Sequence, residues 1–404
     1  MQNPLSLKDF KLSSLRGAAG FFRVAPSTAG RWWLIDPEDH PCFPAAVAGA
    51  ASAPLPGSRL RGWGFGAVTT LGAGAGGPAG LHWLPVAGVS RPGPFLRFGG
   101  ARIPDVFDPS WAEIAADQAK RVCAVAAEDR SVLGWKLDEG LDWAWDEPEG
   151  RPTLLQLCLS LEPRHAAYHA AWEFVLALHE GSFDRLAEDW QVPLTNKELL
   201  RAWTREERGV RTPGYQADHR LWSEECARRY AVGAAAAVRA ADPQHLVFAP
   251  GLARAGAPPW WAEVVGPAVD VMVRRWPAPE WAEGAGAGTG GGERPTWVEG
   301  FCWADPQLYE PPPAAGEPPE WTRLERMLGR GRAALRRLAT EPAVVGWSWP
   351  RWGDAWHGEG VFGPGLVRSD GSDAIEHTEA LTWINAQTTG WRTAGSRRSE
   401  TPGG

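Results

Sequence analysis

The 404-residue sequence lacks the features that mark several large classes of protein. Its five cysteines are scattered and form no CxxC pair, which argues against a disulfide framework and favours a reducing compartment. No apolar run approaches the roughly 18 residues of a membrane-spanning helix, and the N-terminus lacks the apolar core of a signal peptide. We therefore expect a cytoplasmic protein with no membrane partner.

Motifs for metals, nucleotides and nucleic acids are also scarce. The net charge is −7 and the arginines form no basic block, so nucleic acid is not an expected partner. HExxH and GK[ST] patterns do not occur. A G-x-G-x-x-G match at residues 72–77 is followed at once by Pro78 and Gly80, with no helix start to hold a pyrophosphate. We expect neither a metal nor a cofactor.

Tryptophan, by contrast, is abundant, with 25 residues against only 4 tyrosines. One explanation is a tryptophan-rich core. The other is that some of these residues form flat platforms for sugar rings. The composition alone leaves both explanations open.

Eight strand-like segments, separated by helical stretches or by room for crossovers, predict an α/β protein with a single (β/α)8 TIM barrel. The first segment begins with a β-hairpin at the N-terminal end of the barrel, and a helical insertion of about residues 150–217 follows strand four. We expect the barrel to span 21–388, after a flexible N-terminal segment 1–20 and before a disordered tail 389–404. The strand segments are 31–50, 64–71, 81–88, 132–139, 245–251, 268–276, 294–300 and 343–354.

Two strand segments end in acidic residues. VLGWKLDEGLDW (132–143) runs from an apolar stretch into Asp138 and Glu139, and PTWVEGFCWAD (295–305) repeats the design with Glu299. A barrel gathers its strand ends around one mouth, so distant glutamates can face each other there. Glycoside hydrolysis needs two carboxyl groups. The alternative is that these acids pair with arginines at the rim.

The order of motifs over about residues 21–386 resembles the agarase-type (β-agarase-like) glycoside hydrolases of the retaining (β/α)8-barrel clan. The opening hairpin and the later strand and loop segments carry this resemblance together, and no single motif decides it. These segments are GRWWLIDPEDHPCF (30–43), RGWGFGAVTT (61–70), DVFDPSW (105–111), VLGWKLDE (132–139), DPQHLVFAPG (242–251), PTWVEG (295–300) and VVGWSWPRWGD (344–354).

The resemblance implies that Glu139 is the general acid/base and Glu299 the nucleophile, with the two carboxyl groups about 5–5.5 Å apart. It also implies that Asp138 orients a sugar hydroxyl, although the group usually has asparagine there. Gly66 replaces a second asparagine, and residues 274–276 replace an Asn-Tyr pair. The further substrate-binding candidates are Trp143, Trp145, Arg274, Trp276, Trp303, Trp349, Trp352 and Trp356.

Two functions are therefore in view. The first is a retaining glycoside hydrolase acting on β-linked oligosaccharides, with galactan- or agar-type chains as candidates. The alternative is a catalytically impaired barrel protein that binds carbohydrate without hydrolysing it, which the replaced polar residues favour. Both predict an oligosaccharide partner, and neither the sugar nor the oligomeric state follows from the sequence.

Overall fold

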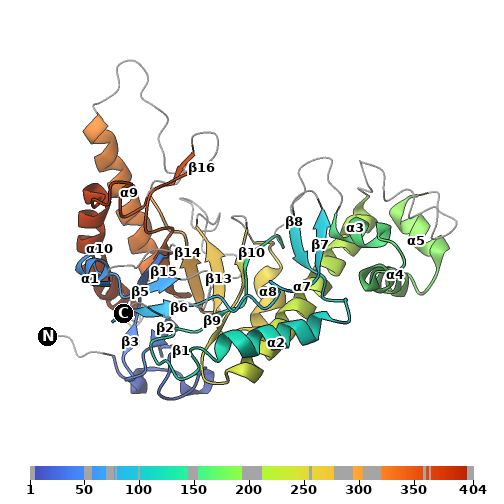
Figure 1. Cartoon of the computed structure of the whole chain (residues 1–404), viewed down its shortest axis with the longest axis horizontal. Coiled ribbons are helices and arrows are strands. Elements are labelled where there is room, and N and C mark those ends of the chain that lie inside the picture. Colours follow the sequence, from blue (N-terminus) through green and yellow to red (C-terminus); the bar gives the residue numbers. More distant parts are fainter. Residues whose placement is uncertain are drawn as a thin grey trace, which may run out of the picture.

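A computed structural model describes residues 5–49, 57–69, 77, 80–98, 101–143, 153–192, 212–253, 257–276, 294–303, 320–357, 361–363 and 365–397. Its centre is a parallel six-stranded sheet in the order β13-β14-β15-β4-β5-β6 (Figure 1). The strands are mostly buried on both faces, as expected for parallel strands covered by other elements. Their bounds are β4 Ala45–Ala48, β5 Ala67–Thr69, β6 His82–Leu84, β13 Met272–Arg275, β14 Thr296–Glu299 and β15 Val344–Trp349. The prediction of an α/β protein is confirmed.

Two further parallel strands lie between β6 and β13. β9 (Trp135–Lys136) pairs with β11 (Val247–Phe248). A bridge between Trp83 and Val132 joins the β6 side to the chain before β9, and a bridge between Phe248 and Val271 joins β11 to the chain before β13. The parallel pairings thus pass through eight segments, in the chain order that the sequence predicted, and return from β15 to β4.

The predicted hairpin lies at the start of this sheet. β1 (Arg23–Pro26), β2 (Trp32–Ile35) and β3 (Pro41–Cys42) form a small antiparallel sheet. In the turn between β2 and β3, one carboxylate oxygen of Asp36 accepts hydrogen bonds from the backbone N–H groups of Glu38 and His40. Asp36 thereby initiates the turn over residues 37–40, a role typical of aspartate.

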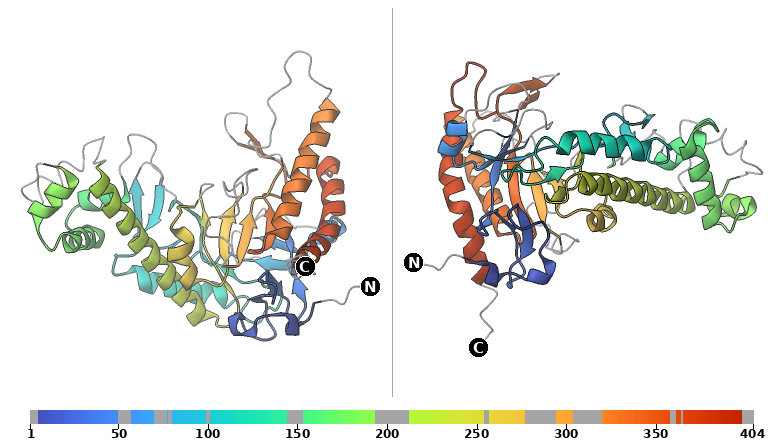
Figure 2. Two further views of the ribbon diagram at one scale, coloured as in Figure 1. Left: turned by 180° about the vertical axis from the view of Figure 1, so that it is seen from behind. Right: turned by 60° about the horizontal axis from the view of Figure 1, so that its bottom comes forward.

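The insertion after strand four is helical and projects from the sheet as an arm (Figure 2). It contains α3 (Leu154–Ser160), α4 (Ala166–Leu178) and α5 (Phe183–Trp190), and the long α7 (Pro213–Ala241) returns along it beside α2 (Trp111–Cys123). The side chains of Thr153, Ser182 and Thr212 cap α3, α5 and α7 by accepting backbone N–H bonds.

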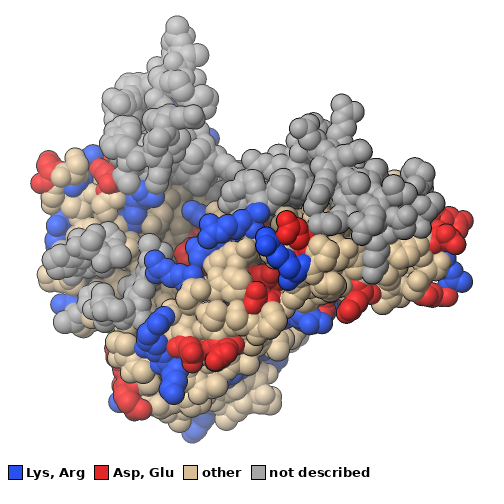
Figure 3. All heavy atoms as spheres, turned by 45° about the vertical axis from the view of Figure 1, so that its right-hand side comes forward, with Lys and Arg blue, Asp and Glu red and all other residues tan. Residues whose placement is uncertain are grey.

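The remaining elements surround the sheet. α9 (Glu320–Thr340) and α10 (Ile375–Arg397) pack against each other on one side (Figure 1). The others are α1 Gly57–Gly62, α8 Trp261–Val265, η4 Gly266–Ala268, the hairpin β7 Phe95–Phe98 with β8 Ala101–Pro104, the parallel pair β10 Glu139–Leu141 with β12 Gly251–Leu252, and the hairpin β16 Ala355–His357 with β17 Val361–Gly363. Among the described helices none is long and apolar enough to cross a membrane. On the face in Figure 3, basic and acidic side chains are interspersed.

Both ends of the described chain are more ordered than the sequence predicted. Residues before β1 form η1 (Leu7–Asp9) and η2 (Leu12–Ser14), bury Phe10, and place the Arg16 guanidinium against the carbonyls of Val269 and Asp270. α10 continues to Arg397 and buries Arg392 completely. The structure thus assigns regular elements and buried side chains to residues within 5–20 and 389–397, where the sequence predicted a flexible segment and a disordered tail. Polar composition does not reveal such contacts, because a few buried side chains hold these segments.

Candidate active site

The carboxyl ends of the central strands surround a cavity of about 420 Å³. This is where parallel strands of an α/β protein usually present functional side chains. Its walls come from the ends of β4, β5, β9, β13, β14 and β15, from the start of β10 and from the loop after β15. The lining residues are Ala48, Gly49, Thr69, Lys136, Glu139, Arg275, Glu299, Gly300, Ser348, Pro350, Arg351, Trp352, Gly353 and Asp354.

The two glutamates predicted from the sequence meet in this cavity. Both form ion pairs with the same atom, Nζ of Lys136, and Oε1 of Glu299 lies 2.5 Å from it. The two carboxyl oxygens that contact Nζ are therefore at most about 5 Å apart, a separation suited to retaining rather than inverting glycosidases.

Local backbone geometry makes room for Glu139. β10 begins at Glu139 and pairs in parallel with β12, where Gly251 stands opposite. A Cβ atom at Gly251 would lie 2.5 Å from Oε2 of Glu139. Any larger residue at position 251 would therefore displace the carboxyl group from Lys136.

Lys136 is the main feature of the site that the sequence analysis missed. Its side chain is only 4% exposed and lies between the two carboxylates. Burial disfavours the ammonium form, but Glu299 and Glu139 outweigh it and raise the pKa of Lys136. The available signal was a lysine within an otherwise apolar strand, because a buried charge requires a partner.

Glu299 sits deeper than Glu139, with 14% of its side chain exposed against 30%. Burial is the largest influence and raises the pKa of Glu299, and repulsion from Glu139 raises it further. Lys136 opposes both effects and favours the carboxylate form. The charge state of Glu299 therefore depends on the lysine.

Asp138 does not line the cavity. The hydroxyl of Tyr230 donates to its Oδ2 at 2.8 Å, and the backbone N–H of Ser90 donates to its carboxylate at 3.2 Å. Burial raises the pKa of Asp138 to about 6. Neighbouring residues on an extended chain point to opposite sides, so Asp138 faces the core where Glu139 faces the cavity. Asp138 makes no contact with the cavity that would support its predicted role of orienting a sugar hydroxyl.

Among the predicted tryptophans whose side chains are described, one lines the cavity. Trp352 does so, with its ring 5.7 Å from that of Trp63. Trp303 and Trp349 are fully buried, and Trp303 donates its N–H to His377 at 2.9 Å. Trp276 is also buried, 5.0 Å from the ring of Phe301. A tryptophan-rich core accounts for these three residues.

The remaining predicted binding residues are Trp145, Trp356 and Arg274. Trp145 and the side chain of Trp356 lie outside the described residues. Arg274 is half-buried, which lowers its pKa, and does not line the cavity. Its neighbour Arg275 does, and its guanidinium donates to the carbonyl of Ala253 at 3.2 Å. The structure therefore places Arg275, and not the predicted Arg274, in the wall of this cavity.

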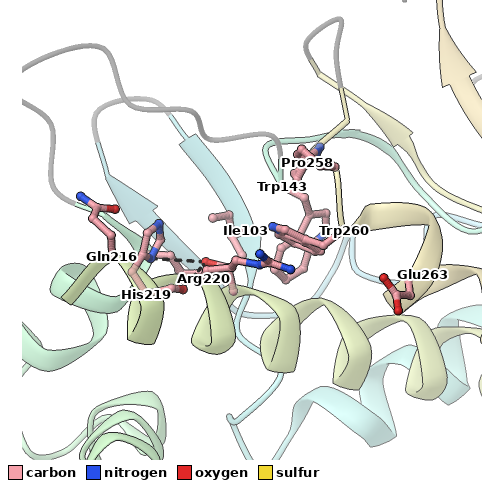
Figure 4. A pocket seen from close by; sticks show the side chains of 11 residues that line it. Ile103, Trp143, Gln216, His219, Arg220, Pro258, Trp260 and Glu263 are labelled. Atoms are coloured by element: carbon pink, nitrogen blue, oxygen red, sulfur yellow. Dashed lines mark hydrogen bonds between the residues drawn. The ribbon is translucent and has the colours of Figure 1, made fainter. Parts of the chain in front are cut away.

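Trp143 lines a different pocket, of about 490 Å³, between α7, β8 and the chain before α8. Figure 4 shows Trp143 and Trp260 on one side of it and His219, Arg220 and Gln216 projecting from α7. Trp143 is 4% exposed and its ring packs against Tyr230 and Trp261. It therefore belongs to the wall between the sheet and the helical arm.

In the described part of the chain, one group of side chains has the spacing of a metal site. His179, Asp189 and Asp218 in the helical arm bring their ligand atoms within 4.8 Å of one another. Asp218 already accepts a hydrogen bond from Trp190 at 2.8 Å and lies 2.7 Å from Nε2 of His179. These bonds explain the cluster as a polar anchor between α4, α5 and α7.

Comparisons with solved structures show a shared fold. No protein-family model and no curated protein matches the sequence. An exo-β-agarase structure superposes with a TM-score of 0.69 at 16% identity, covering 93% of this chain and 66% of that chain. The structure of BpGH50 gives 0.66 at 17% identity, covering 98% and 90%. A β-galactosidase from the Antarctic haloarchaeon Halorubrum lacusprofundi gives 0.53 at 16% identity, covering 85% and 58%.

These likenesses establish a shared fold. The chain spans about two thirds of the length of the exo-β-agarase and nearly all of its own length is used in the match.

Proposed function

We propose that the protein is a retaining β-glycoside hydrolase built on a closed (β/α)8 barrel, with Glu299 as nucleophile and Glu139 as the second catalytic carboxyl group. The observation that carries the proposal is the meeting of these two glutamates, with contacting oxygens at most about 5 Å apart, at the carboxyl ends of parallel strands. The eight parallel segments and the fold shared with an exo-β-agarase and a β-galactosidase support it.

In this mechanism Glu299 attacks the anomeric carbon and forms a glycosyl ester, while Glu139 as general acid gives a proton to the departing oxygen. Water then cleaves the ester, with Glu139 accepting its proton. Burial raises the pKa of Glu299, and Lys136 opposes that rise by favouring the charged form that attacks. Trp352 offers an aromatic face at the cavity wall, and Thr69 and Ser348 offer hydroxyl groups for sugar hydroxyls.

The proposed substrates are β-linked oligosaccharides that contain galactose, since the fold is shared with enzymes for agar and β-galactosides. A cavity of about 420 Å³ falls within the usual range for small-molecule sites.

A second candidate function is carbohydrate binding without hydrolysis. The ammonium of Lys136 favours it, because it pairs with both of the carboxylates that the mechanism requires to reach the substrate. On this reading sugar binding is retained while turnover is absent.

Proton NMR of aryl β-galactoside cleavage separates the two candidates. We expect the protein to release β-galactose first, which then mutarotates, because two displacements at one carbon retain its configuration. Glu113→Ala, an exposed position on α2, serves as the matched control and should behave like the wild type. Binding detected by calorimetry without any product would favour the second candidate, and initial release of α-galactose would exclude the retaining mechanism.

A further inference from the structure

The pocket of about 490 Å³ between the helical arm and the sheet has no role in the proposed mechanism. One of its walls is aromatic and the other is polar. Trp260 and the buried Trp143 form the aromatic wall, and Gln216, His219 and Arg220 project from α7 on the other side (Figure 4). Apolar surface that faces a small number of polar groups is the usual composition of a small-molecule site.

The sequence before α8 holds Trp260 at this pocket. In PPWW (258–261), Trp261 is 1% exposed and belongs to the core, whereas Trp260 is half-buried, with its ring 6.0 Å from that of Trp261. Pro258 and Pro259 fix two backbone φ angles immediately before it. The indole is therefore held in place before any ligand arrives, which lowers the entropic cost of binding against it.

The polar side chains of the pocket favour a neutral ligand that carries hydroxyl groups. Gln216 offers an amide that can donate and accept hydrogen bonds, and Ser223 offers a hydroxyl group. The charged residues Arg220 and Glu263 have opposite signs, and Arg220 already pairs with Glu224 at 2.8 Å. The described lining residues therefore provide no cluster of one charge that would select a phosphate or a carboxylate.

The pocket is close to the catalytic cavity, because the same pair of strands leads to both. β10 begins at Glu139 in the cavity, and Trp143 in the pocket wall follows four residues later. Four residues of extended chain span at most about 14 Å. Beside them, Ala253 donates its N–H to the carbonyl of Leu141 at 2.9 Å, and its own carbonyl accepts from Arg275 of the cavity at 3.2 Å. A chain of a few sugar units is long enough to reach from one site to the other.

We propose that this pocket is a second carbohydrate-binding site, which holds the distal units of a β-linked galacto-oligosaccharide whose terminal linkage lies between Glu139 and Glu299. Trp260 stacks against one sugar ring, and the polar side chains of α7 bind its hydroxyl groups. The choice of galacto-oligosaccharides as ligands rests on the proposed function.

Isothermal titration calorimetry with β-1,4-linked galactotetraose tests the second site. The parent protein carries Glu299→Ala, so that the ligand is not cleaved during the titration. We expect one tetraose bound per chain. Trp260→Ala should raise its Kd at least tenfold, because the apolar contact with the indole is lost. The matched control is Trp383→Ala on α10, where the tryptophan is 49% exposed, and it should leave the Kd unchanged.

The outcomes distinguish a failure of the second site from a failure of the proposed function. An unchanged Kd in folded Trp260→Ala, or no binding of tetraose to the parent protein, would overturn the second site even if the wild type cleaves aryl galactosides. Two tetraose molecules per chain would overturn the claim that one oligosaccharide occupies both sites. A raised Kd in Trp260→Ala, with no cleavage of aryl galactosides by the wild type, would support the second site and overturn the proposed hydrolase.

A second variant covers the case in which Trp260→Ala does not fold. Gln216 is half-buried on α7 and projects into the pocket (Figure 4). Gln216→Ala removes its amide and should raise the Kd for the tetraose at least threefold. An unchanged Kd in Gln216→Ala would then overturn the second site.

Discussion

Replacing Glu299 with alanine should lower kcat/KM for 2,4-dinitrophenyl β-galactoside by about 10⁴-fold or more. Glu299 is the last residue of β14 and lines the cavity. The proposed mechanism has no other group that forms the ester. The loss should persist with this activated leaving group, because the group needs no acid but still needs a nucleophile.

Azide makes this prediction more specific. The small side chain of Glu299→Ala leaves space beside the anomeric carbon, so azide should restore turnover and yield the α-galactosyl azide. Glu113→Ala controls for the loss of a glutamate elsewhere and should retain wild-type kinetics. Full activity of Glu299→Ala without azide would remove Glu299 from the mechanism.

Replacing Arg392 with methionine should lower the free energy of unfolding by about 3 kcal/mol. The Arg392 guanidinium is fully buried and donates to the carbonyls of Ala339 at 3.0 Å, Glu341 at 3.1 Å and Trp32. Methionine fills similar space but leaves these acceptors without their donor. The same residue also ties α10 to α9 and β2, so the loss acts on the packing of the sheet.

Urea denaturation measures the effect of Arg392→Met. The control is Arg228→Met on α7, which removes an exposed arginine paired with Glu225 and should change stability by less than about 1 kcal/mol. Equal stability of the two variants would mean that α10 contributes little to the fold. A large loss confined to Arg392→Met would establish residues 389–397 as part of the folded domain.

The pattern of strand and helix signals, and their spacing along the chain, were sufficient to predict the class of fold. The alternation of strand and helix signals predicted the α/β class, and the parallel segments follow the expected chain order. The position of each glutamate after an apolar run placed Glu139 and Glu299 at strand ends, and parallel strands bring such ends together. The two glutamates are 160 positions apart in the sequence, and the fold brings them into the same cavity.

The direction in which each side chain points, and the residues that it contacts, could not be predicted in the same way. Asp138 and Glu139 are adjacent in sequence, yet one contacts Tyr230 in the core and the other faces the cavity. The sequence around each tryptophan gave no sign of whether it would line the cavity, as Trp352 does, or lie in the core, as Trp303 does. Side-chain direction depends on register and on packing from distant segments, which a local pattern does not contain.

Lys136 illustrates the same limit at the centre of the site. The lysine lies within the quoted stretch 132–143, but its two partners are three and 163 positions away. Its role is evident only in the folded structure, where its ammonium contacts two carboxylates.

Mass spectrometry of a trapped intermediate tests the central claim most directly. The wild-type protein is incubated with 2,4-dinitrophenyl 2-deoxy-2-fluoro-β-galactoside, which forms the glycosyl ester but slows its hydrolysis. We predict one added fluorogalactosyl group per chain, located on Glu299 after proteolysis, and none on Glu299→Ala. A label on Glu139 or another residue, or turnover of the dinitrophenyl galactoside with no trapped ester, would contradict the assignment of Glu299 as the nucleophile of a retaining glycosidase.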